Sequence, residues 1–248
     1  MRKFFAYPLT IIYYLFFGLI LVVFHPIQWI CFNLFGYQAH KKSVDALQFC
    51  LFHCLKFLGT SFTFHNLPNI PKSTPLIVVA NHQSMYDITP MMWKLRKYHP
   101  KFISKKELGK GIPSVSYNLK HGGSVLIDRK NPKQSLMAIK NFAGYIERTK
   151  RTAIIFPEGT RSKTGQPKSF QKRGLLILLN EIPSAMVLPV TINNSWKMFR
   201  YGKFPLGIGN HLIFKFHQPL KNSDFPDNDK FIEELENIVT KDVFKPET

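Results

Sequence analysis

One stretch of the sequence decides the fold class: Ser124–Phe156, which reads SVLIDRKNPKQSLMAIKNFAGYIERTKRTAIIF. It opens and closes with short apolar runs, Ser124–Ile127 and Ala153–Phe156, that are typical of buried strands. Between them, Asn131 suits a helix N-cap and Pro132 suits the first helical position. Apolar residues then recur at helical spacing, at Leu136, Ile139, Ala143 and Ile146. This strand, capped helix and strand indicate a βαβ unit, so we expect parallel strands and an α/β fold.

Apolar runs on both sides of this unit extend the predicted sheet. Leu76–Ala80 (LIVVA) precedes it, Val187–Ile192 (VLPVTI) follows it, and Ile208–Phe216 is a less regular strand pattern. A C-terminal helix is indicated by apolar residues at helical spacing, Phe231, Leu235 and Ile238. We therefore expect a mixed, mostly parallel sheet flanked by helices.

The N-terminal region carries a long uncharged segment, since residues 4–39 contain no Asp, Glu, Lys or Arg. Its first part, Phe4–Phe24, is 21 residues long and just able to span a hydrocarbon core, and we expect Pro26 to interrupt the helix there. Basic pairs flank the segment, Arg2–Lys3 and Lys41–Lys42, which favours both ends on the cytoplasmic side. We therefore expect a hydrophobic helical membrane anchor, either a re-entrant or interfacial hairpin or a single span.

An amphipathic helix is predicted next, over Lys42–Leu58. Its apolar positions follow steps of three and four, at Val44, Leu47, Leu51, Leu55 and Leu58. Cys50, His53 and Cys54 fall within it, but no second group of metal-binding residues follows, so we expect packing and no metal site. Three cysteines are too few for a disulfide framework, which favours a reducing compartment.

The charge of the chain is strongly positive and unevenly distributed. Lys and Arg number 34 against 15 Asp and Glu, a net charge of +19. Residues 1–221 carry 31 basic against 7 acidic residues, whereas residues 222–248 carry 3 against 8. An excess of this size implies an anionic partner: nucleic acid, a membrane surface or a phosphorylated substrate. Zinc-finger, RNP and helix-turn-helix signatures are missing from the sequence, so we expect no nucleic-acid partner.

Polar clusters follow three of the predicted strands. Asn81 and His82 follow the first, Asp128 and Arg129 follow the second, and the segment 157–161 (PEGTR) follows the third. The carboxyl ends of parallel strands meet at one edge of a sheet, which is where open α/β sheets bind their ligands. We therefore expect the three clusters to converge on one site.

His82 and Asp87 suit a general base and the carboxylate that orients it. On a continuous helix, five residues leave two side chains about 140° apart, so a strand-to-helix turn must lie between them. Pro90 is tolerated in a first helical turn and places the helix start near Asp87. The pair His40 and Asp45 has the same spacing, but it follows the uncharged segment and no strand, so we assign it no function.

The segment Glu158-Gly159-Thr160-Arg161 has the features of a phosphate cradle. Glycine permits close backbone approach, threonine offers a hydroxyl, and the arginine guanidinium matches phosphate oxygens. Arg129 is a candidate second clamp, the alternatives being a salt bridge with Glu158 or a plain surface charge.

Four ordered blocks of the sequence resemble the glycerolipid acyltransferases, most closely their 1-acyl-glycerol-3-phosphate (lysophosphatidic acid) branch. The blocks are Asn81–Asp87 (NHQSMYD), Gly123–Arg129 (GSVLIDR), Phe156–Ser162 (FPEGTRS) and Val187–Val190 (VLPV). The resemblance covers roughly residues 60–220, and we expect an α/β acyltransferase catalytic domain over residues 59–248, behind a membrane-associated helical segment over residues 1–58. The resemblance also implies a role in phospholipid biosynthesis at a membrane, and the flanking basic pairs favour a catalytic domain that faces the cytoplasm.

The resemblance further implies a mechanism. His82, held by Asp87, deprotonates the free hydroxyl of lysophosphatidic acid, which attacks an acyl thioester of coenzyme A or acyl carrier protein. Arg161 and Arg129 hold the acceptor phosphate, with Glu158, Gly159 and Thr160 shaping the site. A donor at or near Lys105 stabilises the oxyanion. No cofactor is expected beyond the acyl donor, which is a co-substrate.

Two other kinds of enzyme stay open at this point. One is an acyltransferase for glycerol-3-phosphate or another lysophospholipid, which would share the same four blocks. The other is a lipid hydrolase with Ser84 or Ser162 as its nucleophile beside His82. The sequence contains no G-x-S-x-G nucleophile elbow, which counts against the hydrolase.

Overall fold

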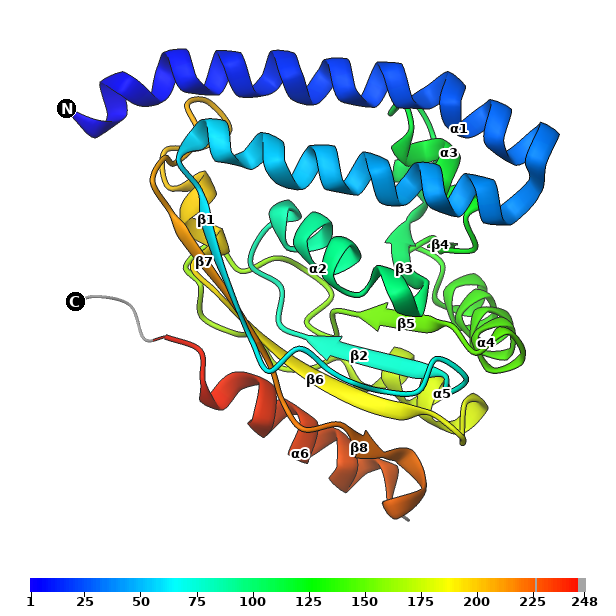
Figure 1. Cartoon of the computed structure of the whole chain (residues 1–248). Helices are drawn as coiled ribbons and strands as arrows, with labels where there is room; N and C mark the ends of the chain where they lie inside the picture. The colour runs from blue at the N-terminus through cyan, green and yellow to red at the C-terminus, as the bar shows by residue number, and fades with distance from the viewer. Residues whose placement is uncertain (226, 245–248) are drawn as a thin grey trace.

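A computed structural model describes residues 1–225 and 227–244. The protein has one twisted sheet with helices on both of its faces (Figure 1). The strands are β1 (Ser61–His65), β2 (Leu76–Ala80), β3 (Pro100–Lys105), β4 (Val125–Ile127), β5 (Thr152–Ile155), β6 (Met186–Asn193), β7 (His211–Phe216) and β8 (Leu220–Lys221). The helices are α1 (Arg2–Cys54), α2 (Ile88–Lys94), α3 (Val115–His121), α4 (Pro132–Thr149), α5 (Lys172–Glu181) and α6 (Asn228–Lys241).

The sheet is mixed and mostly parallel, which confirms the predicted fold class. Its strand order is β1-β7-β6-β2-β5-β3-β4, with β8 pairing with β6. The pairings of β6 with β7 and with β8 are antiparallel, and the others are parallel. The strands of the predicted βαβ unit, β4 and β5, are both parallel to β3, which lies between them. Asn131 caps α4 by accepting a hydrogen bond from the Gln134 N–H at 3.0 Å, as the sequence predicted.

Alternate residues of the central strands enter two separate cores, as the pleat of a strand requires. On one face, Val78 of β2 packs in a cluster with residues of α1 and α2. On the other face, Ile77 and Val79 pack with residues of α4, α5 and α6. The buried side of α6 consists of Phe231, Ile232, Leu235 and Val239, so the predicted stripe is confirmed except that Ile238 is only half-buried.

Helix α1 is a hairpin of two helical arms (Figure 1). The chain reverses at Gly36, whose φ of 74° lies in the left-handed region that glycine adopts freely. The prediction that Pro26 interrupts the first arm is wrong, because the helix continues through it. The rest of the protein after α1, which we call the body, contacts that arm just before the proline. The Ser114 hydroxyl donates to the Leu21 carbonyl at 2.6 Å, and the Ser114 N–H donates to His25 Nδ1 at 3.1 Å.

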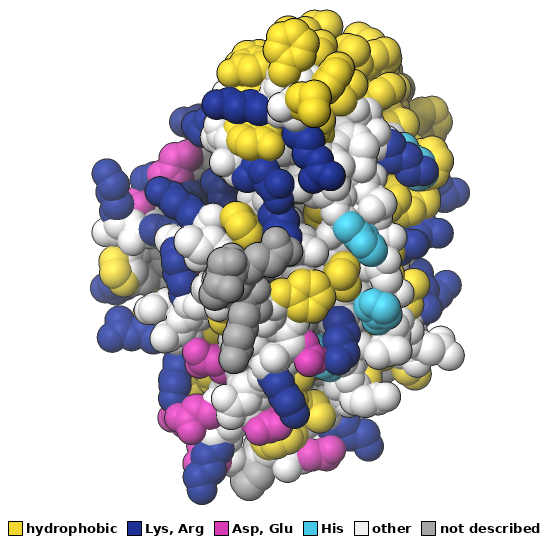
Figure 2. Space-filling view, turned by 90° about the vertical axis from the view of Figure 1, so that its left-hand side faces the viewer, with side chains coloured by type: hydrophobic (Ala, Val, Ile, Leu, Met, Phe, Trp, Pro, Cys, Tyr) yellow, Lys and Arg dark blue, Asp and Glu magenta, His cyan; other side chains and the backbone are white. Residues whose placement is uncertain are grey.

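The outer side of the first arm is apolar and faces away from the body. Figure 2 shows hydrophobic side chains gathered at the end of the molecule formed by α1, with Lys and Arg side chains below them. Its most exposed large apolar residues include Phe4, Leu15, Leu19, Val22, Leu34 and Phe35. By length and composition, the α1 hairpin is the one helical segment of the described residues that is able to cross a membrane. The second arm lies between the first arm and α2.

Candidate active site

The polar clusters that follow β2 and β5 meet at one edge of the sheet. These two strands are neighbours, and Val79 pairs with Ile155 one residue before β2 ends. Asn81 fixes the carboxyl end of β2 against β6, since its side-chain amide donates to the Ile192 carbonyl at 2.9 Å and accepts from the Ile192 N–H at 2.7 Å. The residue after Asn81 is therefore held at the carboxyl edge of the sheet, as the sequence predicted.

His82 and Asp87 are in direct contact. His82 Nδ1 lies 2.8 Å from Asp87 Oδ2, and the same oxygen accepts from the N–H groups of Gln83 (2.8 Å) and Ser84 (2.9 Å). A carboxylate only accepts hydrogen bonds, so in the neutral imidazole Nδ1 carries the proton and Nε2 carries the lone pair. Nε2 has no hydrogen-bond partner among the described residues, and the imidazole is 17% exposed. This is the arrangement of a general base and its orienting carboxylate.

A capped turn brings the pair together. Ser84 is the N-cap of a single turn of 3-10 helix, η2 (Met85–Asp87), and its hydroxyl accepts from the Tyr86 N–H at 3.1 Å. Asp87 completes a capping box from the third position of that turn. The turn replaces the continuous helix that would have held His82 and Asp87 apart, which confirms the strand-to-helix turn predicted between them.

Ser195 is a further partner of Asp87 that the sequence did not reveal. It opens a 3-10 turn, η5 (Ser195–Phe199), directly after β6. Its hydroxyl donates to Asp87 Oδ1, and its N–H donates to Gln83 Oε1 at 3.1 Å. Asp87 and Ser195 are both fully buried, so both oxygens of the carboxylate have fixed donors. No local pattern marks this serine, because its partner lies 108 residues earlier in the chain.

The loop after β5 holds His82 from the other side. The imidazole stacks on Phe156, with ring centroids 4.1 Å apart. Glu158 Oε1 accepts from the His82 N–H at 3.0 Å, and the His82 carbonyl accepts from the Ser162 N–H at 2.7 Å. Gly159, at a φ of 68°, allows the loop to turn between these contacts.

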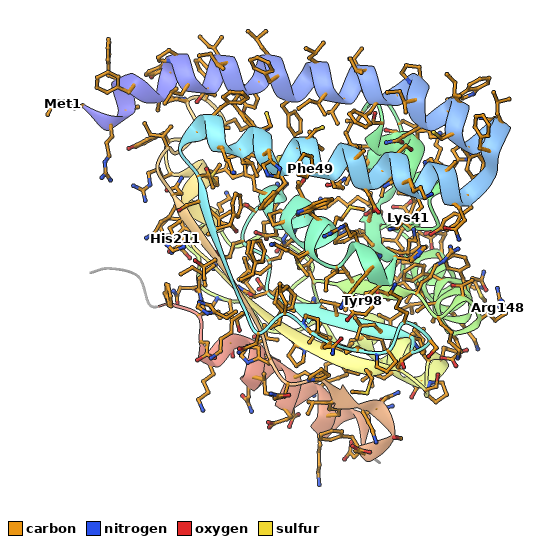
Figure 3. The ribbon with its side chains drawn as sticks, viewed as in Figure 1. Met1, Lys41, Phe49, Tyr98, Arg148 and His211 are labelled. Atoms are coloured by element: carbon orange, nitrogen blue, oxygen red, sulfur yellow. The ribbon has the colours of Figure 1, made fainter. Side chains whose placement is uncertain are left out.

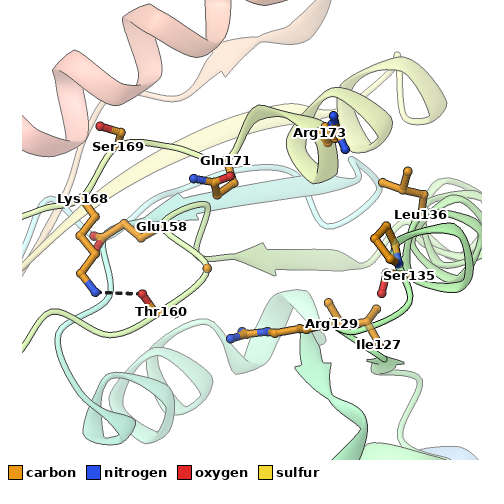
Figure 4. A pocket seen from close by; sticks show the side chains of 12 residues that line it. Ile127, Arg129, Ser135, Leu136, Glu158, Thr160, Lys168, Ser169, Gln171 and Arg173 are labelled. Atoms are coloured by element: carbon orange, nitrogen blue, oxygen red, sulfur yellow. Dashed lines mark hydrogen bonds between the residues drawn. The ribbon is translucent and has the colours of Figure 1, made fainter.

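A cavity of about 620 Å³ opens beside this loop (Figure 4). It contains four of the predicted phosphate-binding residues, and in Figure 4 the Arg129 side chain extends toward Thr160. The lining residues are Ile127, Arg129, Pro132, Ser135, Leu136, Glu158, Gly159, Thr160, Lys168, Ser169, Gln171 and Arg173. Three of them are cations and one is an acid, so the cavity favours an anionic ligand.

Lys168 and Arg173 are lining cations that sequence reasoning missed. Lys168 Nζ donates to the Thr160 hydroxyl at 2.9 Å and to the Arg161 carbonyl at 3.1 Å (Figure 4 draws the first of these bonds). Arg161 is exposed and does not line the cavity, but its positive charge helps to lower the pKa of Arg129, after the larger effect of partial desolvation. Arg129 forms no salt bridge with Glu158 in the described part of the chain, so that alternative for Arg129 is not supported.

Glu158 is an unusual carboxyl group for a surface loop. It is only 4% exposed, and burial is the main reason that its pKa rises to about 7. The hydrogen bond from the His82 backbone and the charge of Lys168 act in the opposite direction. Glu158 therefore connects His82 to the cation-lined cavity and has a pKa near physiological pH.

The remaining predicted residues lie farther from this cavity. Lys105 is the last residue of β3, pairs with Ile127 of β4, and is not among the lining residues. The two serines considered as nucleophiles, Ser84 and Ser162, are buried, and neither hydroxyl contacts His82 among the described residues. The geometry therefore gives no support to a serine hydrolase.

Comparison with known proteins places the chain in a family. A model of the family described as "Acyltransferase" matches residues 61–193, which is 133 of the 248 residues. The chain belongs to the acyltransferase family. The match includes the His82–Asp87 pair and the Glu158–Arg161 segment.

Relatives of the chain include bacterial and plant proteins. It is 36% identical over 126 residues to the 1-acyl-sn-glycerol-3-phosphate acyltransferase of Helicobacter pylori, an alignment that covers 50% of each chain. It is 31% identical over 160 residues to the chloroplastic 1-acyl-sn-glycerol-3-phosphate acyltransferase LPAT1 of Arabidopsis thaliana, covering 63% of this chain and 43% of the relative. The acyltransferase thus spans about half the length of these curated relatives.

The likeness to a solved structure extends over almost the whole chain. The 1-acyl-sn-glycerophosphate (LPA) acyltransferase PlsC of Thermotoga maritima superposes with a TM-score of 0.79 at 25% identity. The superposition covers 98% of this acyltransferase and 96% of the solved chain. The shared fold therefore includes the N-terminal helical hairpin as well as the sheet.

Proposed function

We propose that the chain is a 1-acyl-sn-glycerol-3-phosphate acyltransferase, which converts lysophosphatidic acid into phosphatidic acid in phospholipid biosynthesis. The observation that carries this proposal is the His82–Asp87 pair, whose Nε2 has no hydrogen-bond partner among the described residues. Glu158, which accepts from the His82 N–H, lines the cavity that also contains three cations. The names of the relatives from three organisms agree with it.

In the proposed reaction, His82 Nε2 takes the proton from the free hydroxyl of the acceptor. The hydroxyl oxygen attacks the thioester carbonyl of acyl-CoA or acyl carrier protein, and a C–O bond forms. The C–S bond then breaks, and the leaving thiolate receives the proton back from His82. A thioester is already activated, so positioning and proton transfer suffice without a covalent enzyme nucleophile. Asp87 keeps the imidazole in the tautomer that this requires.

The acceptor phosphate is assigned to the cavity, where Arg129, Thr160 and Lys168 offer charged and hydroxyl donors. Arg161 adds positive charge from the same loop. Lys105, or a backbone N–H beside it, remains our candidate for stabilising the thioester oxyanion. Its place at the end of β3, on the edge where β2 and β5 also end, is compatible with that role.

We assign the α1 hairpin to a membrane surface, as an interfacial anchor with the catalytic domain on the cytoplasmic side. The apolar outer side of its first arm supports this, since Leu15, Leu34 and Phe35 are each at least two-thirds exposed. The second arm is packed against the body and cannot itself enter lipid without breaking that packing. An anchor of this kind would hold the active site near its lipid substrate.

A substrate panel tests this proposal. The full chain, purified in detergent micelles, is given acyl-CoA or acyl carrier protein with lysophosphatidic acid, glycerol-3-phosphate or lysophosphatidylcholine. We expect phosphatidic acid to be the main product, with kcat/KM for the other acceptors at least about tenfold lower because their phosphate or acyl group is mismatched. Equal use of all acceptors, or thioester hydrolysis that ignores the acceptor, would contradict the assignment.

A further inference from the structure

A second group of basic residues lies between the α1 hairpin and the body, away from the candidate active site. It surrounds a small cavity that Lys41 lines, and Figure 3 labels Lys41 near the start of the second arm. We call it the Lys101 cluster and define it by six residues: Tyr37, His40, Lys41, His99, Lys101 and Arg151. Nothing in the proposed acyl transfer uses these side chains.

Lys101 is a buried basic residue without an ion-pair partner among the described residues. Its side chain extends from β3 and is 6% exposed. Asp45 is the acid that lines the cavity, but it already forms an ion pair with Lys41 in the next turn of the same helix. The pKa of Lys101 is lowered to about 7, chiefly by burial; the charges of Arg151 and Lys41 act in the same direction, and the charge of Asp45 opposes them. An uncompensated buried ammonium group is costly, which calls for a compensating anion.

An aromatic ring arranges the cations around the cavity. The Arg151 guanidinium lies 3.8 Å from the centroid of the Tyr37 ring, and Lys101 Nζ lies 5.2 Å from it. The Tyr37 hydroxyl is 3.0 Å from His99 Nδ1, which fixes the ring in this position. Contacts with an aromatic face reduce the cost of holding the two cations together, but they do not neutralise the charge.

His40 adds unused hydrogen-bonding capacity to the same cavity. It lines the cavity and is 1% exposed, and neither of its ring nitrogens has a hydrogen-bond partner in the described part of the chain. A buried imidazole with both nitrogens unpaired is rare, because each unmet polar group costs about 1–3 kcal/mol. His40 therefore points to a ligand in the same way as Lys101 does.

We propose that the Lys101 cluster binds the anionic oxygen of a phosphate group. The cavity is about 10 Å³, so one oxygen enters between Lys101 and His40, while the rest of the phosphate stays outside beside the half-buried Lys41 and Arg151. Free phosphate and the headgroup of an anionic phospholipid share this chemistry. The lipid source is supported by position, because Tyr37 directly follows the hairpin turn at Gly36 and the exposed Leu34 and Phe35.

Phosphate binding is tested in an Arg161→Ala background, which weakens the phosphate site proposed for the acyl acceptor. Thermal unfolding of the full chain is followed with and without inorganic phosphate at constant ionic strength. At ten times Kd, we expect phosphate to raise Tm by about 4 °C. Adding Lys101→Met should abolish this rise, whereas the matched change Lys97→Met, at an exposed lysine nearby, should not.

A second arm of the experiment identifies the source of the phosphate. Co-sedimentation is measured with phosphatidylcholine vesicles with and without phosphatidylglycerol. If the ligand is a headgroup, Lys101→Met should weaken binding to the anionic vesicles at least fivefold more than Lys97→Met does, with no difference on neutral vesicles. If Lys101→Met loses the phosphate-induced rise in Tm but keeps its binding to anionic vesicles, the ligand is free phosphate. Loss of either the rise in Tm or the vesicle binding supports the proposed site.

The proposal is overturned if Lys101→Met keeps both the phosphate-induced rise in Tm and the affinity for anionic vesicles. If Lys101→Met does not fold, His40→Phe decides in the same two assays, because it keeps an aromatic ring while removing both nitrogens. None of these measurements depends on acyl transfer, so they stand apart from the test of the proposed function.

Discussion

Two pairs in this acyltransferase share the spacing His-x4-Asp, yet they form different structures. His82 and Asp87 are in contact at 2.8 Å, and Asp87 is fully buried. His40 and Asp45 lie on the continuous second arm of α1, where Asp45 binds Lys41 and His40 has no hydrogen-bond partner among the described residues. The spacing is therefore not what makes a dyad.

The difference lies in the backbone between the two residues. Five residues on a continuous helix leave two side chains about 140° apart, which is the situation of His40 and Asp45. At the other pair, the chain leaves β2, turns at Ser84 and starts a new helical turn, so that Asp87 points back at His82. A strand end followed by a capping serine is thus the informative feature of the sequence.

The largest effect is expected from breaking the proposed catalytic pair, His82 and Asp87. His82→Ala should lower kcat for acyl transfer about 10³-fold, because general base catalysis is lost. Steady-state kinetics with lysophosphatidic acid and acyl-CoA check this, alongside His65→Ala at an exposed histidine that ends β1. Equal kinetics for the two variants would mean that His82 is not the base.

A smaller effect on catalysis is expected from replacing Lys168, the cation whose hydrogen bonds hold the loop after β5. Lys168→Met should raise KM for lysophosphatidic acid about tenfold while kcat changes little, because its bonds to Thr160 and to the Arg161 carbonyl position the phosphate site. Lys163→Met, at an exposed lysine of the same loop, is the control. A change in kcat with an unaltered KM would place Lys168 in the chemical step instead.

Ser195 sharpens the contrast between the two aspartates, since Asp45 has no equivalent hydroxyl donor among the described residues. Ser195→Ala should lower kcat/KM about fivefold. It should also move the acidic limb of the pH profile to higher pH, because a carboxylate with one donor fewer binds the imidazolium more strongly. Ser195→Thr keeps the hydroxyl and should restore the profile. A lower rate with an unmoved limb would indicate a purely structural serine.

The last prediction concerns stability near the functional pair. Glu158 has its pKa raised to about 7, so between pH 4.5 and 7 the native carboxyl holds a proton that the unfolded chain releases. The free energy of unfolding should therefore fall as pH rises through this window, by at most about 3 kcal/mol. Urea unfolding should show that Glu158→Gln removes this fall. Parallel pH curves for the two proteins would rule out a shifted Glu158.

Much of the fold and the site could be predicted because the signals are local. The strand ends before His82, Arg129 and Glu158, and the cap at Asn131, each depend on a few neighbouring residues. The pairing of β1 with β7 joins segments about 150 residues apart, which no local pattern encodes.

The features that were missed depend on tertiary contacts. The helix continues through Pro26 and reverses at Gly36, and Ser114 of the body contacts the first arm just before the proline. Ser195 reaches the site from the turn after β6, and Lys168 comes from farther along the loop after β5, with no motif of their own. His40 is the converse case: it has the His-x4-Asp spacing in the sequence, but its imidazole forms no hydrogen bond with Asp45.

The most direct test is a double-mutant cycle on kcat/KM with His82→Ala, Asp87→Ala and the double variant. If the two residues act as one dyad, the double variant should be no more than about threefold worse than His82→Ala alone, because Asp87 acts through the imidazole. If the two losses multiply, Asp87 works independently of His82, and the account of a base oriented by its carboxylate is wrong.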